Sequence, residues 1–327
     1  MKVLVYDVAA ESGGALSVLK EFYEKAVSDV DTEWVFILSV VKLSSKDNIK
    51  VENYPEVKKS WIKRYFFDKF TAPRIIKKHS PDVVLNLQNI TVRTKSKQIL
   101  YMQQSLPFSP FRFTLAHKKL WVIQNVLGGM IKRSCKKADE IIVQSEWIRK
   151  AVSEQCKVPE ERIVVKSPKV DKSKLRIFEA EKCKGFFYPA AGSFYKNHTV
   201  VARACTLLKE QGYDYGEVVF TLRGDETEEI REIYEISREK GLNITWEGEM
   251  TREEVFRTYS EYALIFPSFI ETFGLPLLEA RESGAPVLAA DTPFAREILA
   301  NYEKAEFFPY DNPEILAEKI KTLKEKI

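Results

Sequence analysis

The stretch "YALIFPSFIETFGLPLLEARESGAPVLAA", Tyr262–Ala290, predicts the local unit that decides the fold. Its first apolar run, bounded by Pro267, is typical of a short buried strand. Pro276 suits the first position of a helix, where its missing N–H costs nothing, and Gly284 suits the left-handed residue that ends one. The apolar run "APVLAA" then predicts a second buried strand. Because a strand–helix–strand crossover joins parallel strands, the stretch indicates an α/β fold.

The loop inside this unit joins the carboxyl end of a strand to the amino end of a helix, and we expect a ligand there. The N–H groups of Phe273, Gly274 and Leu275 have no helical partners, and a helix N-terminus that carries a glycine is a good cradle for phosphate. The carboxylates of Glu271 and Glu279 cannot bind phosphate. We therefore expect them to accept hydrogen bonds from sugar hydroxyls on the same ligand.

The chain has 327 residues, more than a single core comfortably holds, so we expect two domains. Predicted strands and helices alternate from "KVLVYDV" to "EIIVQS". The lysine-rich segment "KSPKVDKSKLRIFEAEKCKG" interrupts this pattern, which restarts at "FFYPAAG", and we place the domains at 1–168 and 169–327. The two successive alternations predict two doubly wound parallel sheets that face each other across a cleft at their carboxyl edges.

Composition and motifs argue against several classes of protein. No apolar run reaches the roughly 18 residues that cross a bilayer, and "MKVLVYDVAAES" is typical of a first strand rather than a signal peptide. The pattern G-x-G-x-x-G is absent, which argues against a nicotinamide dinucleotide. The four cysteines lack metal-type spacing, and "DVD" at Asp29–Asp31 is better interpreted as a surface turn than as a metal site. We expect no metal or other cofactor, and a cytoplasmic protein, free or peripheral on the inner face of the cell membrane.

Charge is divided unevenly between the two halves of the chain. Residues 1–165 hold 28 Lys and Arg against 18 Asp and Glu, a balance of +10, and the rest hold 23 against 29, a balance of −6. The first half therefore favours an anionic partner. Within it, residues 58–78 and 107–137 predict either a helix on an anionic membrane surface or an aromatic core with a solvated basic rim. No nucleic-acid-binding module accompanies this charge, so we do not expect nucleic acid as a partner.

The stretch "ALIFPSFIETFGLPLLEARESGAPVLAADTPFAREIL" resembles the most specific motif of the retaining nucleotide-sugar glycosyltransferases of family four, within glycosyl transferases group one. "KADEIIVQSEWIRKAV", "ITWEGEM" and "AAESGGALS" agree with this family, so the resemblance covers nearly the whole chain. It implies the two-domain GT-B fold, with the acceptor on the side of residues 1–168 and the nucleotide-sugar donor bound by residues 169–327.

The resemblance implies a role for each candidate residue. Glu279 would bind the ribose hydroxyls of the nucleotide, Glu271 would hold hydroxyls of the donor sugar, and the amides of Phe273–Leu275 would take the diphosphate. Lys196, in "GSFYKNHTV", would neutralise the phosphates, and the pair Gly13–Gly14 would let the first-domain loop approach the donor closely. Glu271 and Lys196 would thus be the catalytic residues.

Each assignment has a plainer alternative. Glu279 could be a solvated helix residue, and Glu271 could cap the following helix through its dipole. Lys196 could be a surface lysine, and the pair Gly13–Gly14 could be a simple turn.

The sequence departs from the family pattern at three places. Relatives carry an arginine shortly before the phosphate-binding lysine, where this chain has "YPAAGSFY"; Arg223 in "TLRGD" is the candidate replacement. Relatives also carry a first-domain histidine near the donor sugar, and the matching stretch "YMQQSLPF" offers Gln103 and Gln104 instead. Glutamine hydrogen-bonds a sugar hydroxyl but cannot act as a base at neutral pH. After "EILAEKIKTLKEKI" the chain lacks the segment with which relatives return to the first domain.

The resemblance implies a retaining hexosyltransferase. Such an enzyme would move a sugar from a UDP- or GDP-linked donor to a glycan or polyprenyl-linked acceptor, in the biosynthesis of a cell-surface polysaccharide. The alternative is a catalytically silent subunit on the same fold that binds a nucleotide sugar or assists assembly.

Overall fold

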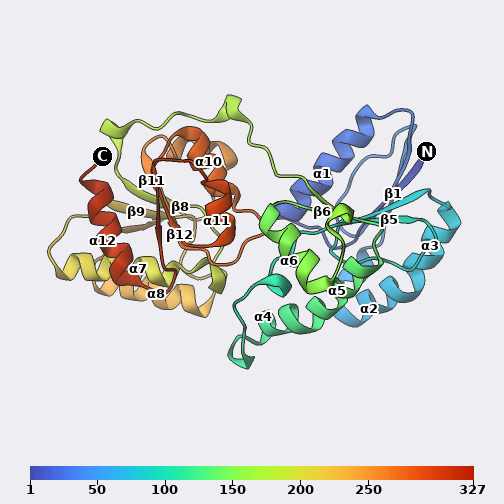
Figure 1. The fold of residues 1–327 in the computed structure, drawn as a ribbon, viewed down its shortest axis with the longest axis horizontal. Coiled ribbons are helices and arrows are strands. Elements are labelled where there is room, and N and C mark those ends of the chain that lie inside the picture. Colours follow the sequence, from blue (N-terminus) through green and yellow to red (C-terminus); the bar gives the residue numbers. More distant parts are fainter. The chain divides into compact units, whose positions relative to one another are not determined.

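The computed structural model describes all residues from 1 to 327 and divides them into two compact units, Met1–Ser167 and Pro168–Ile327 (Figure 1). The division lies inside the lysine-rich segment quoted above. Each unit has its own parallel sheet with helices packed against it, so the predicted α/β class with two doubly wound sheets is confirmed. None of the helices combines the length and the apolar character that spanning a bilayer requires.

The N-terminal unit contains a seven-stranded sheet in the order β3-β2-β1-β4-β5-β6-β7, with every neighbouring pair parallel. Strand order reverses between β1 and β4, and ligands of doubly wound sheets bind outside the carboxyl ends of the strands at such a point. The strands are β1 Lys2–Asp7, β2 Glu33–Leu38, β3 Ile49–Asn53, β4 Val83–Asn86, β5 Lys97–Tyr101, β6 Glu140–Val143 and β7 Ile163–Val165. The helices are α1 Gly13–Ser28, α2 Trp61–Phe66, α3 Ala72–His79, α4 Lys118–Val122, α5 Gly128–Lys137 and α6 Glu146–Cys156.

Strand β1 shows how this sheet is covered on both faces. Val3 and Val5 pack in one hydrophobic cluster with Leu19 of α1. Leu4 and Tyr6 face the other way and pack in a second cluster with residues of α3. Because successive side chains of a strand point to opposite faces, a strand that is buried on both sides is apolar throughout, as "VLVY" is.

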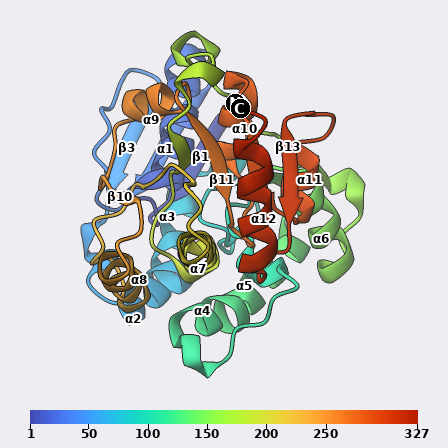
Figure 2. The same cartoon turned by 90° about the vertical axis from the view of Figure 1, so that its left-hand side faces the viewer.

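The C-terminal unit contains a six-stranded parallel sheet in the order β10-β9-β8-β11-β12-β13, so its strand order reverses between β8 and β11. Helices α7 and α12 pack against each other, and α10 packs on β11 (Figure 2). The strands are β8 Gly185–Tyr188, β9 Glu217–Phe220, β10 Ile244–Trp246, β11 Tyr262–Phe266, β12 Val287–Ala290 and β13 Ala305–Phe308. The helices are α7 His198–Glu210, α8 Glu228–Glu239, α9 Arg252–Thr258, α10 Leu275–Ser283, α11 Pro293–Ile298 and α12 Pro313–Lys324.

The unit from β11 to β12 forms as its sequence predicts. All five residues of β11 are buried, which fits an apolar run at the centre of a parallel sheet. Helix α10 follows with Pro276 in its first turn and ends at Gly284, which has a left-handed backbone with φ of 77°. Proline in the first turn and glycine at the end are the expected boundary residues of a helix.

Candidate functional site

The loop between β11 and α10 leaves a row of backbone amides without partners. Gly274 precedes the helix with φ of 97°, a conformation that side chains rarely adopt. A Cβ atom at this position would lie 3.1 Å from the Leu277 side chain, which is closer than an ordinary van der Waals contact. The N–H groups of Phe273, Gly274 and Leu275 donate to no group of the chain. This is the geometry of an anion-binding helix N-terminus.

Lys196 and Glu271 lie in contact, although 75 residues separate them in the sequence. Lys196 is in the turn after β8 and Glu271 is in the loop after β11, and these strands are neighbours at the point where strand order reverses. The Lys196 Nζ to Glu271 Oε1 distance is 2.5 Å, and the two side chains are 19% and 15% exposed. Lys196 is therefore not a free surface lysine, and Glu271 has a partner other than the helix dipole.

The loop that carries Lys196 is held in place by a hydrogen bond from Tyr188, the last residue of β8. The buried Tyr188 hydroxyl donates to the Lys196 carbonyl oxygen at 2.8 Å and shares a 3.0 Å hydrogen bond with Ser268 Oγ. Ser268 lies in the loop that also holds Glu271. Tyr188 thus fixes the two loops relative to each other, which keeps the Lys196 ammonium close to the Glu271 carboxylate.

Glu279 is buried, with 1% of the residue exposed, so the alternative of a solvated helix residue is wrong. The Tyr259 hydroxyl donates to Glu279 Oε2 at 3.1 Å, and Arg252 forms an ion pair with Oε1. Burial raises the pKa of the Glu279 carboxyl, while Arg252 and Tyr259 act to lower it. The Arg252 side chain is itself 52% exposed, so the group that covers the buried carboxylate reaches the surface.

A pocket of about 570 Å³ lies at the carboxyl ends of three neighbouring strands, β8, β9 and β10. Its volume is within the range of small-molecule sites. Arg223 lines this pocket, and its side chain lies over Gly248, where an added Cβ would be 3.2 Å from Arg223 Cγ. Neither Lys196 nor Glu271 is among the lining residues. They are Pro189, Ala190, Ala191, Gly192, Thr221, Leu222, Arg223, Asp225, Glu226, Glu249, Met250 and Val255.

Three of the candidate residues belong to the N-terminal unit. Gly13 and Gly14 begin α1, and Gly13 has φ of 59°, a conformation that favours glycine. The Gln103 side chain donates from Nε2 to the Leu87 carbonyl at 2.9 Å, which ties together the loops after β4 and β5. The neighbouring Gln104 accepts from the Leu106 amide at 3.2 Å. Both side-chain amides stabilise the loops in which they lie. The side-chain oxygen of Gln103, Oε1, has no hydrogen bond to the chain.

Sequence reasoning missed the partners of Glu279. Arg252 and Tyr259 lie at the two ends of the segment that forms α9, and no spacing motif connects them to α10. Helix α9 itself carries a capping box between Thr251 and Glu254, which is a visible start signal in the sequence. That signal could locate the helix but not the carboxylate that its first residue contacts. No group of three His, Cys, Asp or Glu residues is placed to hold a metal ion.

The sequence of the C-terminal unit is similar to that of known glycosyltransferases. The family model "Glycosyl transferases group 1" matches residues 170–326. The chain is 28% identical over 174 residues to the O-antigen chain mannosyltransferase RfbU of Salmonella typhimurium. That match covers 53% of this chain and 48% of RfbU, so it spans about half of the relative's length.

Solved structures share the whole fold at low sequence identity. The lipopolysaccharide outer core galactosyltransferase WaaB has a TM-score of 0.69 and 16% identity, covering 100% of this chain and 91% of WaaB. Anabaena Alr3699/HepE in complex with UDP-glucose has a TM-score of 0.67 and 15% identity, covering 100% and 90%. WaaG, a glycosyltransferase involved in lipopolysaccharide biosynthesis, has a TM-score of 0.72 and 12% identity, covering 99% and 90%. Residues 170–326 therefore match the glycosyl transferases group 1 family model, and the chain as a whole has the two-domain GT-B fold.

Proposed function

We propose that this protein transfers a sugar from a nucleotide-diphosphate donor to a glycan or lipid-linked acceptor, with retention of configuration, in the synthesis of lipopolysaccharide or another cell-surface polysaccharide. The observation that carries the proposal is the contact between Lys196 and Glu271 beside three unpartnered backbone amides. Such a site offers positive potential for a diphosphate and a carboxylate for sugar hydroxyls. Two similar proteins support the proposal: RfbU is an O-antigen chain mannosyltransferase, and HepE is solved in complex with the nucleotide sugar UDP-glucose.

In this proposal, different residues of the C-terminal unit bind the diphosphate, the sugar, the ribose and the nucleobase of the nucleotide-sugar donor. The amides of Phe273–Leu275 and the Lys196 ammonium bind the diphosphate, and Glu271 turns to the hydroxyls of the donor sugar once Lys196 is engaged. Glu279 binds the ribose after Arg252 moves aside. The nucleobase occupies the pocket that Arg223 lines, and UDP, which HepE binds, is the first nucleotide to test, with GDP as the second.

Catalysis in this proposal is electrostatic. The leaving diphosphate gains negative charge as the bond to the sugar breaks, so a cation placed beside it stabilises the transition state more than the bound substrate. Lys196 is that cation. In a front-face transfer the departing phosphate takes the proton of the acceptor hydroxyl, so glutamines at 103 and 104 in place of a histidine leave the reaction possible.

Mass spectrometry of reactions tests this function. The full chain is offered UDP-glucose, UDP-galactose and GDP-mannose, each with and without a lipid extract from bacterial cytoplasmic membrane. We expect one donor to lose its sugar to an acceptor in the extract, with slow hydrolysis when the extract is left out. Tight nucleotide-sugar binding without transfer or hydrolysis would instead support the silent binding subunit.

The acceptor side of the proposal concerns the N-terminal unit and an anionic membrane surface. The exposed fractions of Trp61, Ile62, Tyr65, Phe66 and Phe70 are 62%, 63%, 39%, 54% and 45%, so these four aromatics and one isoleucine are not a core. They lie along α2 and the π-helical turn that follows it, where their spacing places them on one side of the helix. Exposed aromatics flanked by basic residues suit the interface of an anionic leaflet.

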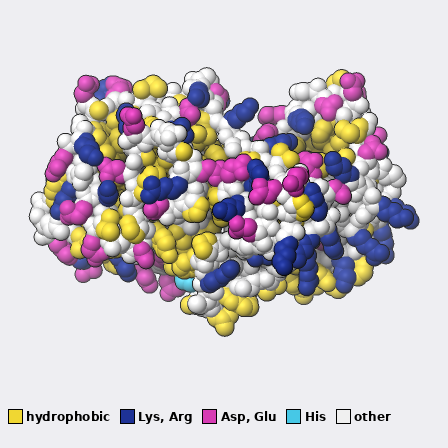
Figure 3. Space-filling view, viewed as in Figure 1, with side chains coloured by type: hydrophobic (Ala, Val, Ile, Leu, Met, Phe, Trp, Pro, Cys, Tyr) yellow, Lys and Arg dark blue, Asp and Glu magenta, His cyan; other side chains and the backbone are white.

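The second stretch behaves differently. Phe108 and Phe113 are buried, as the core-and-rim interpretation predicts, and the large apolar side chains that are exposed here are Leu115, Val122 and Val126. Figure 3 shows basic and hydrophobic side chains gathered along the lower edge of the N-terminal unit, near the places of α2 and α5 in Figure 1. We therefore assign the membrane contact to residues 59–78, with the 107–137 stretch contributing a smaller part.

A further inference from the structure

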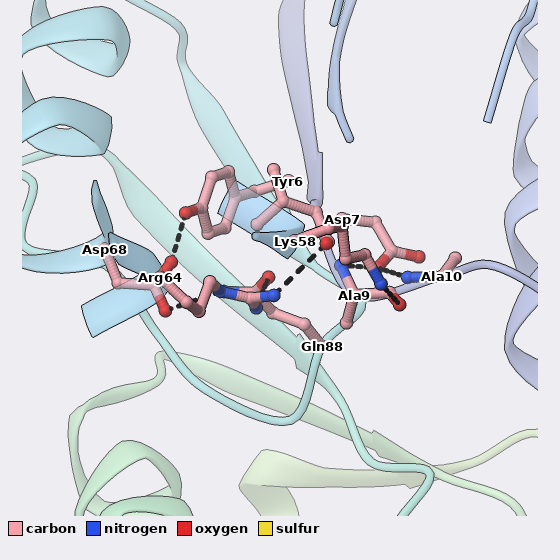
Figure 4. Close-up of polar contacts among 9 residues, drawn as sticks. Tyr6, Asp7, Ala9, Ala10, Lys58, Arg64, Asp68 and Gln88 are labelled. Atoms are coloured by element: carbon pink, nitrogen blue, oxygen red, sulfur yellow. Dashed lines mark hydrogen bonds and ion pairs between the residues drawn. The ribbon is translucent and has the colours of Figure 1, made fainter. Parts of the chain in front are cut away.

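A polar cluster lies where β1 ends, at the point where the strand order of the N-terminal sheet reverses (Figure 4). It joins Asp7, the last residue of β1, to Lys58 and Arg64, which come from the segment around α2. Gln88 completes it from the residues after β4. Because ligands of doubly wound sheets bind at this edge, the cluster occupies the expected place of a ligand site in this unit.

Asp7 has one carboxylate oxygen without a partner although the residue is only 2% exposed. Its Oδ1 accepts from the Ala9 amide at 3.2 Å and from the Ala10 amide at 3.0 Å, and these bonds fold the loop around the carboxylate. Its Oδ2 is shielded from solvent and accepts from nothing. Buried polar atoms are nearly always hydrogen-bonded, so an unpaired carboxylate oxygen at a ligand edge indicates a partner that arrives from outside the chain.

Lys58 and Arg64 hold the loop that covers Asp7. Arg64 Nη1 donates to the Val8 carbonyl at 3.1 Å, and Lys58 Nζ donates to the Ala9 carbonyl at 2.7 Å. Arg64 is in turn held by Asp68 at 2.9 Å and by the Gln88 side-chain oxygen at 2.6 Å. Both cations are partly exposed, with 24% and 21% of the side chain accessible, so the loop is fastened by groups that a ligand can reach.

The charges around Asp7 restrict the chemistry of its partner. A carboxylate oxygen repels a phosphate, and the two neighbouring cations repel a metal ion or an ammonium group. Burial raises the pKa of the Asp7 carboxyl, whereas the backbone amides, Arg64 and Lys58 act to lower it. The partner that remains is a neutral hydrogen-bond donor, for which a sugar hydroxyl or acetamido N–H is the matching group.

We propose that Asp7 Oδ2 binds a hydroxyl or acetamido N–H of the acceptor sugar, and that Arg64 and Lys58 are positioning residues for the loop Val8–Glu11 that opens to admit it. This inference rests on the proposed function, because it names the part of the N-terminal unit that recognises the acceptor. The site takes a neutral sugar and is separate from the residues of the C-terminal unit that bind the donor.

Calorimetric titration of the full chain with simple glycosides tests the assignment. The probes are methyl α-mannoside, methyl α-glucoside, methyl β-galactoside and methyl N-acetyl-β-glucosaminide, each added in the presence of saturating UDP. We expect at least one to bind, and Asp7→Asn to weaken it about tenfold or more, because an uncharged amide replaces a charged acceptor. Asparagine keeps a side-chain oxygen for the Ala9 and Ala10 amides, so the loop should keep its fold.

Asp82→Asn is the matched control. Asp82 Oδ2 also accepts from a backbone amide, that of Lys2 at 2.7 Å, but it does so at the amino end of β1, the opposite edge of the same sheet. This variant should bind the glycoside as the wild type does. Arg64→Lys is the second test variant, since it keeps the charge but loses the forked donor, and it should weaken the glycoside severalfold.

The outcomes separate this inference from the proposed function. Binding of no glycoside by the wild type, or equal binding by wild type, Asp7→Asn and Arg64→Lys, would overturn the assignment of Asp7. UDP affinity, measured in the same samples before the glycoside is added, tests the proposed donor site independently of the glycoside. A wild-type protein that binds no nucleotide contradicts the proposed function, whatever the glycosides do.

Discussion

Lys196 and Glu271 neutralise each other while the donor site is empty, and this pairing affects nucleotide affinity. A diphosphate has to take Lys196 from Glu271, so part of its interaction energy replaces a contact that already exists. Both side chains are mostly buried, so we take the upper end of the range for surface ion pairs, about 1 kcal/mol, as the contribution of this contact. Under the proposed function we therefore expect Glu271 to lower the affinity for free nucleotide and to supply a carboxylate for the hydroxyls of the donor sugar.

Glu271→Gln should therefore separate nucleotide binding from sugar transfer. We expect UDP affinity to stay the same or to rise by up to about fivefold, because the competing negative charge is gone. Transfer and hydrolysis should fall, because glutamine is a weaker acceptor for the sugar hydroxyls. Calorimetry with UDP and a hydrolysis assay with the correct nucleotide sugar measure the two effects. A variant that loses UDP affinity would show that Glu271 does not oppose the diphosphate.

Glu279 makes a prediction about pH and stability. Burial raises the pKa of its carboxyl above the usual 4.5, so the folded protein binds this proton more tightly than the unfolded chain does. The folded state is then favoured by this group at low pH, and that stabilisation is lost as pH rises through the folded pKa. The Tm of the wild type, measured relative to that of Glu279→Gln, should therefore decrease as pH rises above 4.5, because glutamine does not titrate. Scanning calorimetry of both proteins across pH 4 to 8 measures these Tm values. A wild-type Tm that rises with pH relative to that of Glu279→Gln would mean that the Arg252 ion pair outweighs burial.

Glu279→Ala should weaken nucleotide binding as well. Ribose hydroxyls would lose a charge-assisted acceptor worth about 1.5–3 kcal/mol, which is roughly a 10- to 150-fold loss of affinity. Tyr259→Phe is the matched control, because it removes the hydroxyl that donates to Glu279 but keeps the carboxylate itself. UDP calorimetry on both folded variants decides the assignment. Equal affinities for wild type and Glu279→Ala would leave the ribose without this partner.

At the scale of elements, sequence patterns predicted the central strands and the boundaries of α10 correctly. Strand β11 is apolar throughout, strand β1 is apolar from Val3 to Tyr6, and proline and glycine mark the two ends of α10. The edge strand β3, "IKVEN", was not predicted, because only its first residue is fully buried and its polar residues resemble those of a loop. Contacts between distant elements, such as Arg252 of α9 with Glu279 of α10, depend on the packing of helices and leave no mark in either segment.

The α2 segment carries the prediction about the membrane, and the structure changes which residues test it. Lys58 and Arg64 point inward to the Val8–Ala9 carbonyls, so replacing them would disturb the loop that they hold. Lys59, Lys63 and Lys69 are exposed beside the aromatics. Replacing these three by glutamate should abolish binding to vesicles that contain anionic lipid, since each nearby basic residue contributes about 1 kcal/mol of leaflet attraction.

The control for this experiment is a triple variant with the same change of charge. Lys20, Lys25 and Lys46 are exposed elsewhere in the N-terminal unit, on and after α1. Their replacement by glutamate should leave most vesicle binding intact, and wild-type binding should weaken as salt is raised. Co-sedimentation of the full chain with the vesicles measures both. Equal loss in the two triple variants would indicate attraction by net charge alone and would remove α2 from the account.

At the scale of the whole molecule, the alternation of strands and helices was enough to predict two doubly wound sheets. It was enough because parallel strands have to be joined by crossovers, and right-handed crossovers leave few topologies. The contacts within the candidate site could not be predicted from the sequence pattern alone. The loops that hold Lys196 and Glu271 could be located at strand ends, whereas their 2.5 Å contact required the order of β8 and β11 in the sheet. Asp7 gave no signal beyond ending an apolar strand, and its unpaired oxygen is visible only in the folded unit.

The rate of nucleotide-sugar hydrolysis by wild type and Lys196→Ala, set beside their affinities for the same nucleotide sugar, tests the central claim most directly. If Lys196 stabilises the departing diphosphate, the variant should lose on the order of 100- to 1,000-fold in turnover while its affinity falls much less. Lys184→Ala, which removes an exposed lysine before β8 that pairs with Glu261, should hydrolyse the donor at the wild-type rate. A loss confined to affinity, or a wild type that binds its donor and never hydrolyses or transfers the sugar, would contradict the account.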